Sequence, residues 1–196
     1  MKKNFFNATL ALMLLLGLTV AAFKVQAQAS KAPLTATEIM EQAKQQAKAE
    51  NKNILLLFHA SWCGWCKKME ASIMDKSCKD YFDSNFVITY VDVLETGSNV
   101  SLENPGGRQL LEEYGGAESG IPYWLIFSAD GKLLADSKIH SADGSSPNEG
   151  QNMGCPAQVE EVEYFIGLLK QHSQMTGQQA AAIRQRFLKN APASTQ

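Results

Sequence analysis

The stretch ILLLFHASWCGWCK, residues 54–67, decides the fold that we expect. Residues 54–59 form a mostly apolar run of strand length, which predicts a strand buried on both faces. Two cysteines, Cys63 and Cys66, follow this run at once, and residues 67–73 continue at helical spacing. The pattern therefore predicts a cysteine pair at the start of a helix that directly follows a buried strand.

This placement of the two cysteines favours thiol–disulfide exchange, in which the attacking group is a thiolate. A helix N-terminus presents unpaired N–H groups and the positive end of the helix dipole, so it should lower the pKa of Cys63 below that of free cysteine. Cys66 lies one turn further along and should attack second, which releases a mixed disulfide. Trp62 and Trp65 flank Cys63 and offer an apolar surface to an incoming chain.

Three other interpretations of the cysteine pair compete. A stable structural disulfide at this place remains an alternative interpretation. A zinc site needs four ligands, and the sequence has no second Cys-x-x-Cys and no His-x-x-x-His, so we expect no metal. A c-type haem site needs His directly after Cys66, where the sequence has Lys67. The position between a strand and a helix favours the redox interpretation.

The remaining chain alternates between helical and strand patterns, with Thr37 and Asp75 as expected N-caps. We expect helices over residues 37–52, 67–73, 76–83, 108–114 and 176–190, and one that begins near Pro156. We expect strands over residues 54–59, 86–93, 123–127 and 132–136. Alternation produces parallel strands, and the Asp130-Gly131 turn adds an antiparallel edge. The expected fold class is α/β, with a mixed central sheet and helices on both faces.

Residues 1–29 have the layout of a secretory signal peptide. Two lysines precede an apolar run over residues 8–22, and small residues follow it. A transmembrane anchor is the alternative, but this run is short of the ~20 residues that a spanning helix needs. Cleavage after Ala29 removes three lysines and no acid, so the formal charge changes from −2 to −5. We therefore expect a periplasmic or secreted protein, with neither nucleic acid nor an anionic membrane surface as a partner.

Ile121-Pro122 is the second candidate site element. A proline near the start of a strand can follow a cis peptide bond. With Pro122 cis, the backbone N–H and C=O of Ile121 would be free to pair with an extended substrate segment.

Together these motifs resemble the thioredoxin superfamily over residues 37–170. The string at 54–67, the Tyr-Val-Asp at 90–92 and the Gly-Ile-Pro at 120–122 carry the resemblance. The Cys-Gly-Trp-Cys form is most similar to exported thioredoxin-like proteins of bacteria. The resemblance implies a thioredoxin-like fold, Cys63 as nucleophile, Cys66 as resolving thiol and a cis Pro122 facing them. The substrate-binding residues are expected to be Trp62, Gly64, Trp65, Ile121 and Pro122.

The chain departs from thioredoxin proper at several positions. Thioredoxin has a buried acid on the strand before the motif and a lysine on the next strand, and the matching positions here are expected to be Leu57 and Ile88. His59 stands where the family often has an aromatic residue, and we expect it to be packed in the core. Trp65 replaces the usual proline before the second cysteine, at a position that tunes the redox potential.

Two further cysteines have no role in this motif. Cys78 is expected to be a small buried hydrophobe. A Cys78–Cys155 disulfide and a third redox thiol at Cys155 are the alternatives. The long polar segment over residues 137–155 is expected to border the substrate groove, since long loops are often functional. His140, within it, is expected to be solvated.

These observations predict a monomeric thiol–disulfide oxidoreductase that needs no cofactor, with the reductase direction favoured over the oxidase. Residues 30–175 should form the thioredoxin-like domain, and residues 176–196 a C-terminal helical extension and tail. The expected partners are exported cysteine-containing proteins and a membrane-bound electron donor or acceptor. A thioredoxin-fold module that only binds a partner or a metal is the alternative function.

Overall fold

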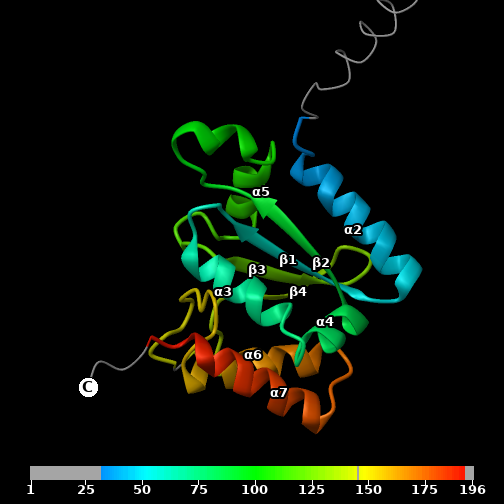
Figure 1. Ribbon diagram of the computed structural model, residues 1–196, viewed down its shortest axis with the longest axis vertical. Coiled ribbons are helices and arrows are strands. Elements are labelled where there is room, and N and C mark those ends of the chain that lie inside the picture. Colours follow the sequence, from blue (N-terminus) through cyan, green and yellow to red (C-terminus); the bar gives the residue numbers. More distant parts are fainter. Residues whose placement is uncertain (1–31, 145, 193–196) are drawn as a thin grey trace, which may run out of the picture. The chain divides into compact units, whose positions relative to one another are not determined.

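The computed structural model describes residues 32–144 and 146–192, and the expected signal peptide lies outside this part of the chain. One four-stranded sheet lies at the centre, with the strand order β2-β1-β3-β4 (Figure 1). The strands are β1 (Asn53–His59), β2 (Phe86–Asp92), β3 (Tyr123–Phe127) and β4 (Leu133–Asp136). β1 pairs parallel to β2 and antiparallel to β3, and β3 pairs antiparallel to β4. The predicted mixed α/β sheet is confirmed.

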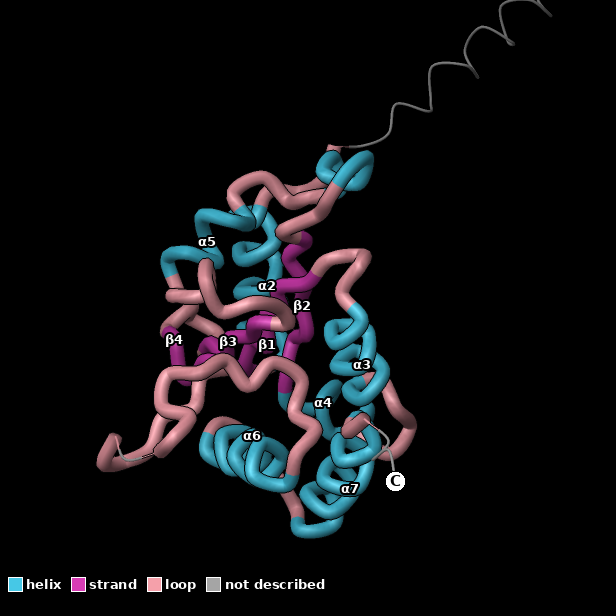
Figure 2. The backbone as a smooth tube through the Cα atoms, turned by 90° about the vertical axis from the view of Figure 1, so that its left-hand side faces the viewer, coloured by secondary structure: helices cyan, strands magenta, loops and turns pink. Residues whose placement is uncertain are grey.

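Helices cover both faces of the sheet (Figures 1 and 2). On one face lie α2 (Ala36–Glu50) and α5 (Gly107–Glu113). On the other face lie α3 (Gly64–Ile73), α4 (Lys79–Asn85), α6 (Val159–Gln171) and α7 (Gly177–Phe187). Two short 3-10 helices, Gly97–Leu102 and Leu188–Asn190, complete the described elements.

Strand β1 supplies side chains to both layers because successive residues point to opposite faces of a sheet. Leu55 and Leu57 belong to the core beneath α3, α4, α6 and α7. Ile54, Leu56 and Phe58 belong to the core beneath α2 and α5. The residues from Ile54 to Phe58 are all buried, as the apolar run at 54–59 predicts.

The two expected N-caps were wrong. Helix α2 begins after Thr35, whose side chain accepts from the Glu38 N–H while the Glu38 carboxylate accepts from the Thr35 N–H. This reciprocal capping box satisfies two unpaired donors, which Thr37 does not do. Helix α4 begins at Lys79, and Asp75 instead accepts from Ser77 in the turn before it.

Helix α7 packs into the same core as α6. Its buried residues Ala180, Ile183 and Phe187 share that core with Phe165, and the rings of Phe165 and Phe187 are 5.2 Å apart. Within residues 32–144 and 146–192, no helix has the length and apolar character needed to cross a membrane.

Candidate active site

Cys63 and Cys66 form a disulfide at the junction between β1 and α3. Cys63 is the N-cap residue of α3, and the Cys66 N–H donates to Cys63 Sγ at 3.1 Å. A sulfur in this position takes the place of the usual capping oxygen. When the pair is reduced, the same N–H and the helix dipole stabilise negative charge on Cys63 Sγ.

The disulfide is buried while the aromatic residues around it are exposed. Cys63 and Cys66 are 3% and 5% exposed, and Ala60 and Ile121 pack against them. Trp62 and Trp65 are 54% and 41% exposed. An incoming chain therefore meets two apolar ring surfaces before it reaches sulfur.

The Ile121-Pro122 dipeptide lies beside the cysteine pair. Its peptide bond is cis, and the Ile121 carbonyl oxygen is 3.6 Å from Cys63 Sγ. Within the described residues, no hydrogen bond engages the Ile121 N–H. The structure thus brings Ile121 and Pro122 next to the cysteine pair and leaves one backbone donor available there.

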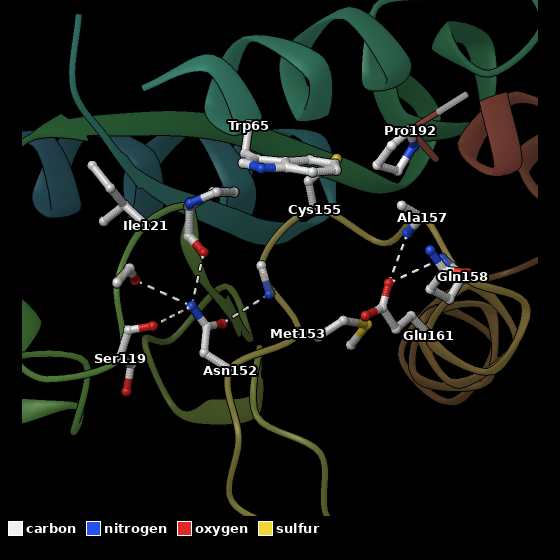
Figure 3. A pocket seen from close by; sticks show the side chains of 13 residues that line it. Trp65, Ser119, Ile121, Asn152, Met153, Cys155, Ala157, Gln158, Glu161 and Pro192 are labelled. Carbon is white, nitrogen blue, oxygen red and sulfur yellow. Dashed lines mark hydrogen bonds between the residues drawn. The ribbon is translucent and has the colours of Figure 1, made fainter. Parts of the chain in front are cut away.

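Asn152 fastens the loop that contains Pro122 (Figure 3). Its Nδ2 amide donates to the carbonyl oxygens of Ser119, Gly120 and Pro122 at 3.0, 3.1 and 3.1 Å. Its Oδ1 accepts from the Gly154 N–H at 3.0 Å. Sequence reasoning missed Asn152, because nothing local distinguishes one asparagine in a long polar segment from another.

The long segment over residues 137–155 also lines a cavity beside the redox pair. The cavity has a volume of about 370 Å³, and Trp65, Ile121 and Pro122 line it. Met153 and Cys155 from the long segment line it as well, and Figure 3 shows both of them together with Trp65 and Ile121. This segment therefore lies beside Trp65, Ile121 and Pro122, and its role at a substrate groove stays a prediction.

Comparisons with known proteins find thioredoxin-like relatives. The thioredoxin-like family matches residues 35–129. The thiol:disulfide interchange protein DsbD of Photorhabdus laumondii is 30% identical over 90 residues, which are 46% of this chain and 14% of that protein. The disulfide bond reductase DsbH of Chlamydia pneumoniae is 26% identical over 111 residues, which are 56% of this chain and 66% of that protein.

Residues 35–129 of this chain are thus thioredoxin-like.

A solved structure with a similar fold is the disulphide isomerase from Xylella fastidiosa. It is 20% identical, with a TM-score of 0.45, and covers 83% of this chain and 93% of its own. The chain spans only a small part of DsbD and about two thirds of DsbH.

A buried carboxylate holds the segment that precedes the cysteine motif. Glu95 is 3% exposed and lies just after β2. Its Oε1 accepts from the Ser61 N–H at 2.6 Å, and its Oε2 accepts from the Ser61 hydroxyl at 2.7 Å. Next to it, the Trp62 indole N–H donates to the Leu94 carbonyl at 2.8 Å. Sequence reasoning missed Glu95, since its partner is 34 positions away.

His59 is half-buried rather than packed in the core as expected. Its Nε2 is 3.0 Å from an Asp92 carboxylate oxygen, and its ring centroid is 5.1 Å from that of Tyr90. The pKa of Asp92 is raised, first by burial and further by the charge of Glu95, against the lowering effect of His59.

The predicted position of thioredoxin's buried acid holds the apolar residue Leu57. Leu57 is buried, but its partner on β2 is Tyr90, whereas Ile88 pairs with Leu55. The match of Leu57 and Ile88 to thioredoxin's acid and lysine stays a prediction, and both positions carry apolar side chains. Burial raises the pKa of Tyr90 to about 12, so its hydroxyl stays neutral near pH 7.

Cys78 and Cys155 are both free and buried, so they form no disulfide with each other. Burial raises the pKa of the Cys155 thiol to about 12, and the Asn190 side chain donates to its sulfur at 3.4 Å. Burial raises the pKa of Cys78 as well. A protonated thiol is a poor nucleophile, which argues against Cys155 as a third redox thiol.

Metal sites need clusters of ligand side chains. Among the described residues, no group of three or more His, Cys, Asp or Glu side chains is arranged to hold a metal ion.

Proposed function

We propose that this protein exchanges disulfides with cysteine-containing proteins through Cys63 and Cys66. The observation that carries the proposal is the position of Cys63 as the N-cap of α3, where the Cys66 N–H reaches its sulfur. The names of the relatives DsbD and DsbH support the same chemistry. We further propose an exported compartment, on the strength of the signal-peptide pattern in residues 1–29.

The proposed reaction has two exchange steps. The Cys63 thiolate attacks one sulfur of a substrate disulfide, and the other substrate sulfur leaves as a thiolate. The Cys66 thiolate then attacks Cys63 Sγ, which releases the second substrate sulfur and forms the Cys63–Cys66 disulfide. Two electrons pass to the substrate, and solvent carries the two cysteine protons to the released thiolates. A dithiol protein, proposed to be membrane-bound, reduces the pair again.

The surrounding residues are assigned substrate-binding roles in this proposal. The exposed rings of Trp62 and Trp65 present apolar surface, and the Ile121 N–H offers a donor to an extended substrate backbone. Gly64 directly follows Cys63 and has no side chain, and the space that a Cβ would occupy there is open. A substrate backbone can therefore approach Cys63 closely from this side. Pro122 lines the cavity beside Ile121, and it is assigned contact with the substrate as well.

We propose that the Cys63/Cys66 pair acts as a reductase of substrate disulfides, and that the protein is a monomer. The name of the reductase DsbH supports this direction. Equilibration with glutathione buffers measures the reduction potential of the Cys63/Cys66 pair. A potential of about −270 mV is typical of a reductase, and one of about −120 mV is typical of an oxidant. A pair that no buffer reduces would be a structural disulfide.

A Cys66→Ser variant tests the exchange itself. It lacks the resolving thiol, so the reduced variant should accumulate mixed disulfides with protein substrates through Cys63, detectable by mass spectrometry. The double variant Cys63→Ser/Cys66→Ser is the matched control and should accumulate none. If the single variant also traps no substrate, the protein is a binding module that transfers no electrons.

A further inference from the structure

We propose that the cavity beside the redox pair binds a cationic side chain, lysine or arginine, of the substrate polypeptide, and that Glu161 selects it. This inference rests on the proposed function, because the cavity can act as a substrate subsite only if exchange takes place at Cys63. It assigns a charge preference to the substrate, which the fold by itself does not give.

The position of the cavity connects it to the site of exchange. Trp65 lies one residue before Cys66, and Ile121 packs against the disulfide and also lines the cavity. A substrate segment that reaches Cys63 therefore passes the mouth of the cavity. Its volume of about 370 Å³ lies within the usual range for ligand pockets, about 300–1,000 Å³.

The lining of the cavity matches the two parts of a lysine or arginine side chain. Trp65, Ile121 and Met153 supply apolar and aromatic surface for the methylene stem. Among the described residues that line the cavity, Glu161 alone carries a charge. A cationic head on an apolar stem is the side chain that this combination fits.

The carboxylate of Glu161 is held in a fixed position with one oxygen still available. Its Oε2 accepts from the N–H groups of Ala157 and Gln158 at 2.9 and 3.0 Å, in the capping box of α6 (Figure 3). In the described part of the chain, no donor reaches Oε1. An ion pair formed with a carboxylate that is already fixed costs less side-chain entropy than one between two mobile chains.

Two cations close to cavity-lining residues, Lys68 and Arg186, are engaged elsewhere. Lys68 Nζ lies 4.2 Å from the centroid of the Trp65 ring and donates to the Asn190 carbonyl at 2.9 Å. Arg186 donates to Asp75 and to the Asn190 side chain. Neither Lys68 nor Arg186 lines the cavity, so neither neutralises Glu161 from within it.

The test uses the reduced full chain and short peptides whose single cysteine is joined in a disulfide to thionitrobenzoate. Exchange at Cys63 releases the coloured thionitrobenzoate, and Cys66 then releases the peptide. The peptides differ only in having Arg, Met or Glu at each of the positions from one to three residues on either side of cysteine. We expect the Arg peptides to react fastest and the Glu peptides slowest at one or more of these positions.

Two variants isolate the carboxylate. Glu161→Gln keeps an oxygen that accepts in the capping box and removes the charge. Glu160→Gln removes the same charge from the neighbouring exposed position, outside the cavity. The ratio of the Arg rate to the Glu rate should fall roughly two- to fivefold in Glu161→Gln, the range of single ion pairs, and stay unchanged in Glu160→Gln.

Salt dependence gives a second measurement that needs no variant. Raising the ionic strength from about 0.01 M to about 0.15 M shortens the Debye length from ~30 to ~8 Å, so the Arg-to-Glu ratio of the wild type should fall. Equal Arg and Glu rates at every position, a preference for Glu, or an unchanged ratio in Glu161→Gln would overturn this inference. The uncharged Met peptides distinguish failure of this inference from failure of the proposed function. If the wild type reacts with the Met peptides, and with all the others, no faster than Cys63→Ser does, the proposed function itself is wrong.

Discussion

Replacing Asn152 with alanine removes the side chain that holds the loop around Pro122 in place. The amide donates towards three carbonyl oxygens, those of Ser119, Gly120 and Pro122, and accepts from the Gly154 N–H. An NH₂ group has two hydrogens, so two donated bonds and one accepted bond are present at any time. Each contributes about 0.5–1.5 kcal/mol, and water recovers part of this at a half-buried site. We expect a loss of about 2 kcal/mol in the free energy of unfolding.

This loss should appear in two independent measurements. For a chain of this size, about 2 kcal/mol lowers the Tm by roughly 4–8 °C. The rate of exchange, measured well below the Tm of both proteins, should also fall by roughly tenfold, because a 1 Å misplacement of a positioning group can cost about a hundredfold. At that temperature the variant is folded, so the rate reports the position of Ile121 rather than the folded fraction.

Asn148→Ala is the matched control, since Asn148 is exposed in the same long segment and its side chain forms no hydrogen bond within the described residues. Its Tm and exchange rate should equal those of the wild type. An Asn152→Ala variant with unchanged Tm and unchanged rate would refute the reasoning. A lower Tm with an unchanged rate would leave Asn152 as a contributor to stability alone.

Three further predictions concern the buried groups around the site. Glu95→Gln places an amide NH₂ group against one of the two Ser61 donors, so the rate of exchange should fall. The free energy of unfolding in urea should fall by about 1–3 kcal/mol, whereas Glu118→Gln, at an exposed position, should change neither the rate nor this free energy. Cys155 should stay unmodified by iodoacetamide in the native protein at pH 8, because burial raises its pKa to about 12. Since this folded pKa lies above the unfolded pKa, the contribution of the thiol to stability is complete below about pH 9 and is lost between about pH 9 and 12. The wild type should therefore lose more unfolding free energy over that pH range than Cys155→Ala does. Phe187→Ala should cost about 3–5 kcal/mol of unfolding free energy, which would place α7 inside the folding unit; a cost under about 1 kcal/mol would leave residues 176–196 as an appendage.

The central strands and the cysteine junction were predictable because their signals are local. An unbroken apolar run gives a strand buried on both faces, and β1 differs from its expected range by one residue. The start of α2 is predictable, since Thr35 and Glu38 form the S/T-x-x-E pattern of a capping box that Thr37 lacks.

The polar contacts that position the site could not be predicted from sequence. Glu95 and Asn152 act on backbone groups about 30 positions away, and their partners are the N–H of Ser61 and the carbonyls around Pro122. Backbone groups carry no sequence signal, so only the meeting of two loops in the folded chain identifies the side chain that serves them. Burial of a carboxylate is the clearest sign afterwards, because an acid removed from water must be hydrogen-bonded.

The exposure of the site separates its chemistry from its choice of partner. Cys63 and Cys66 are nearly inaccessible, while Trp62 and Trp65 beside them are open to solvent. Reagents that cannot bind to the ring surfaces gain no binding energy with which to approach the sulfur, whereas a polypeptide that covers both rings buries apolar area worth about 25 cal/mol per Å². In the proposed mechanism, discrimination among substrates therefore belongs to the rings, the Ile121 backbone and the cavity beside them, and the helix N-terminus supplies the reactivity of Cys63 towards any chain that binds there.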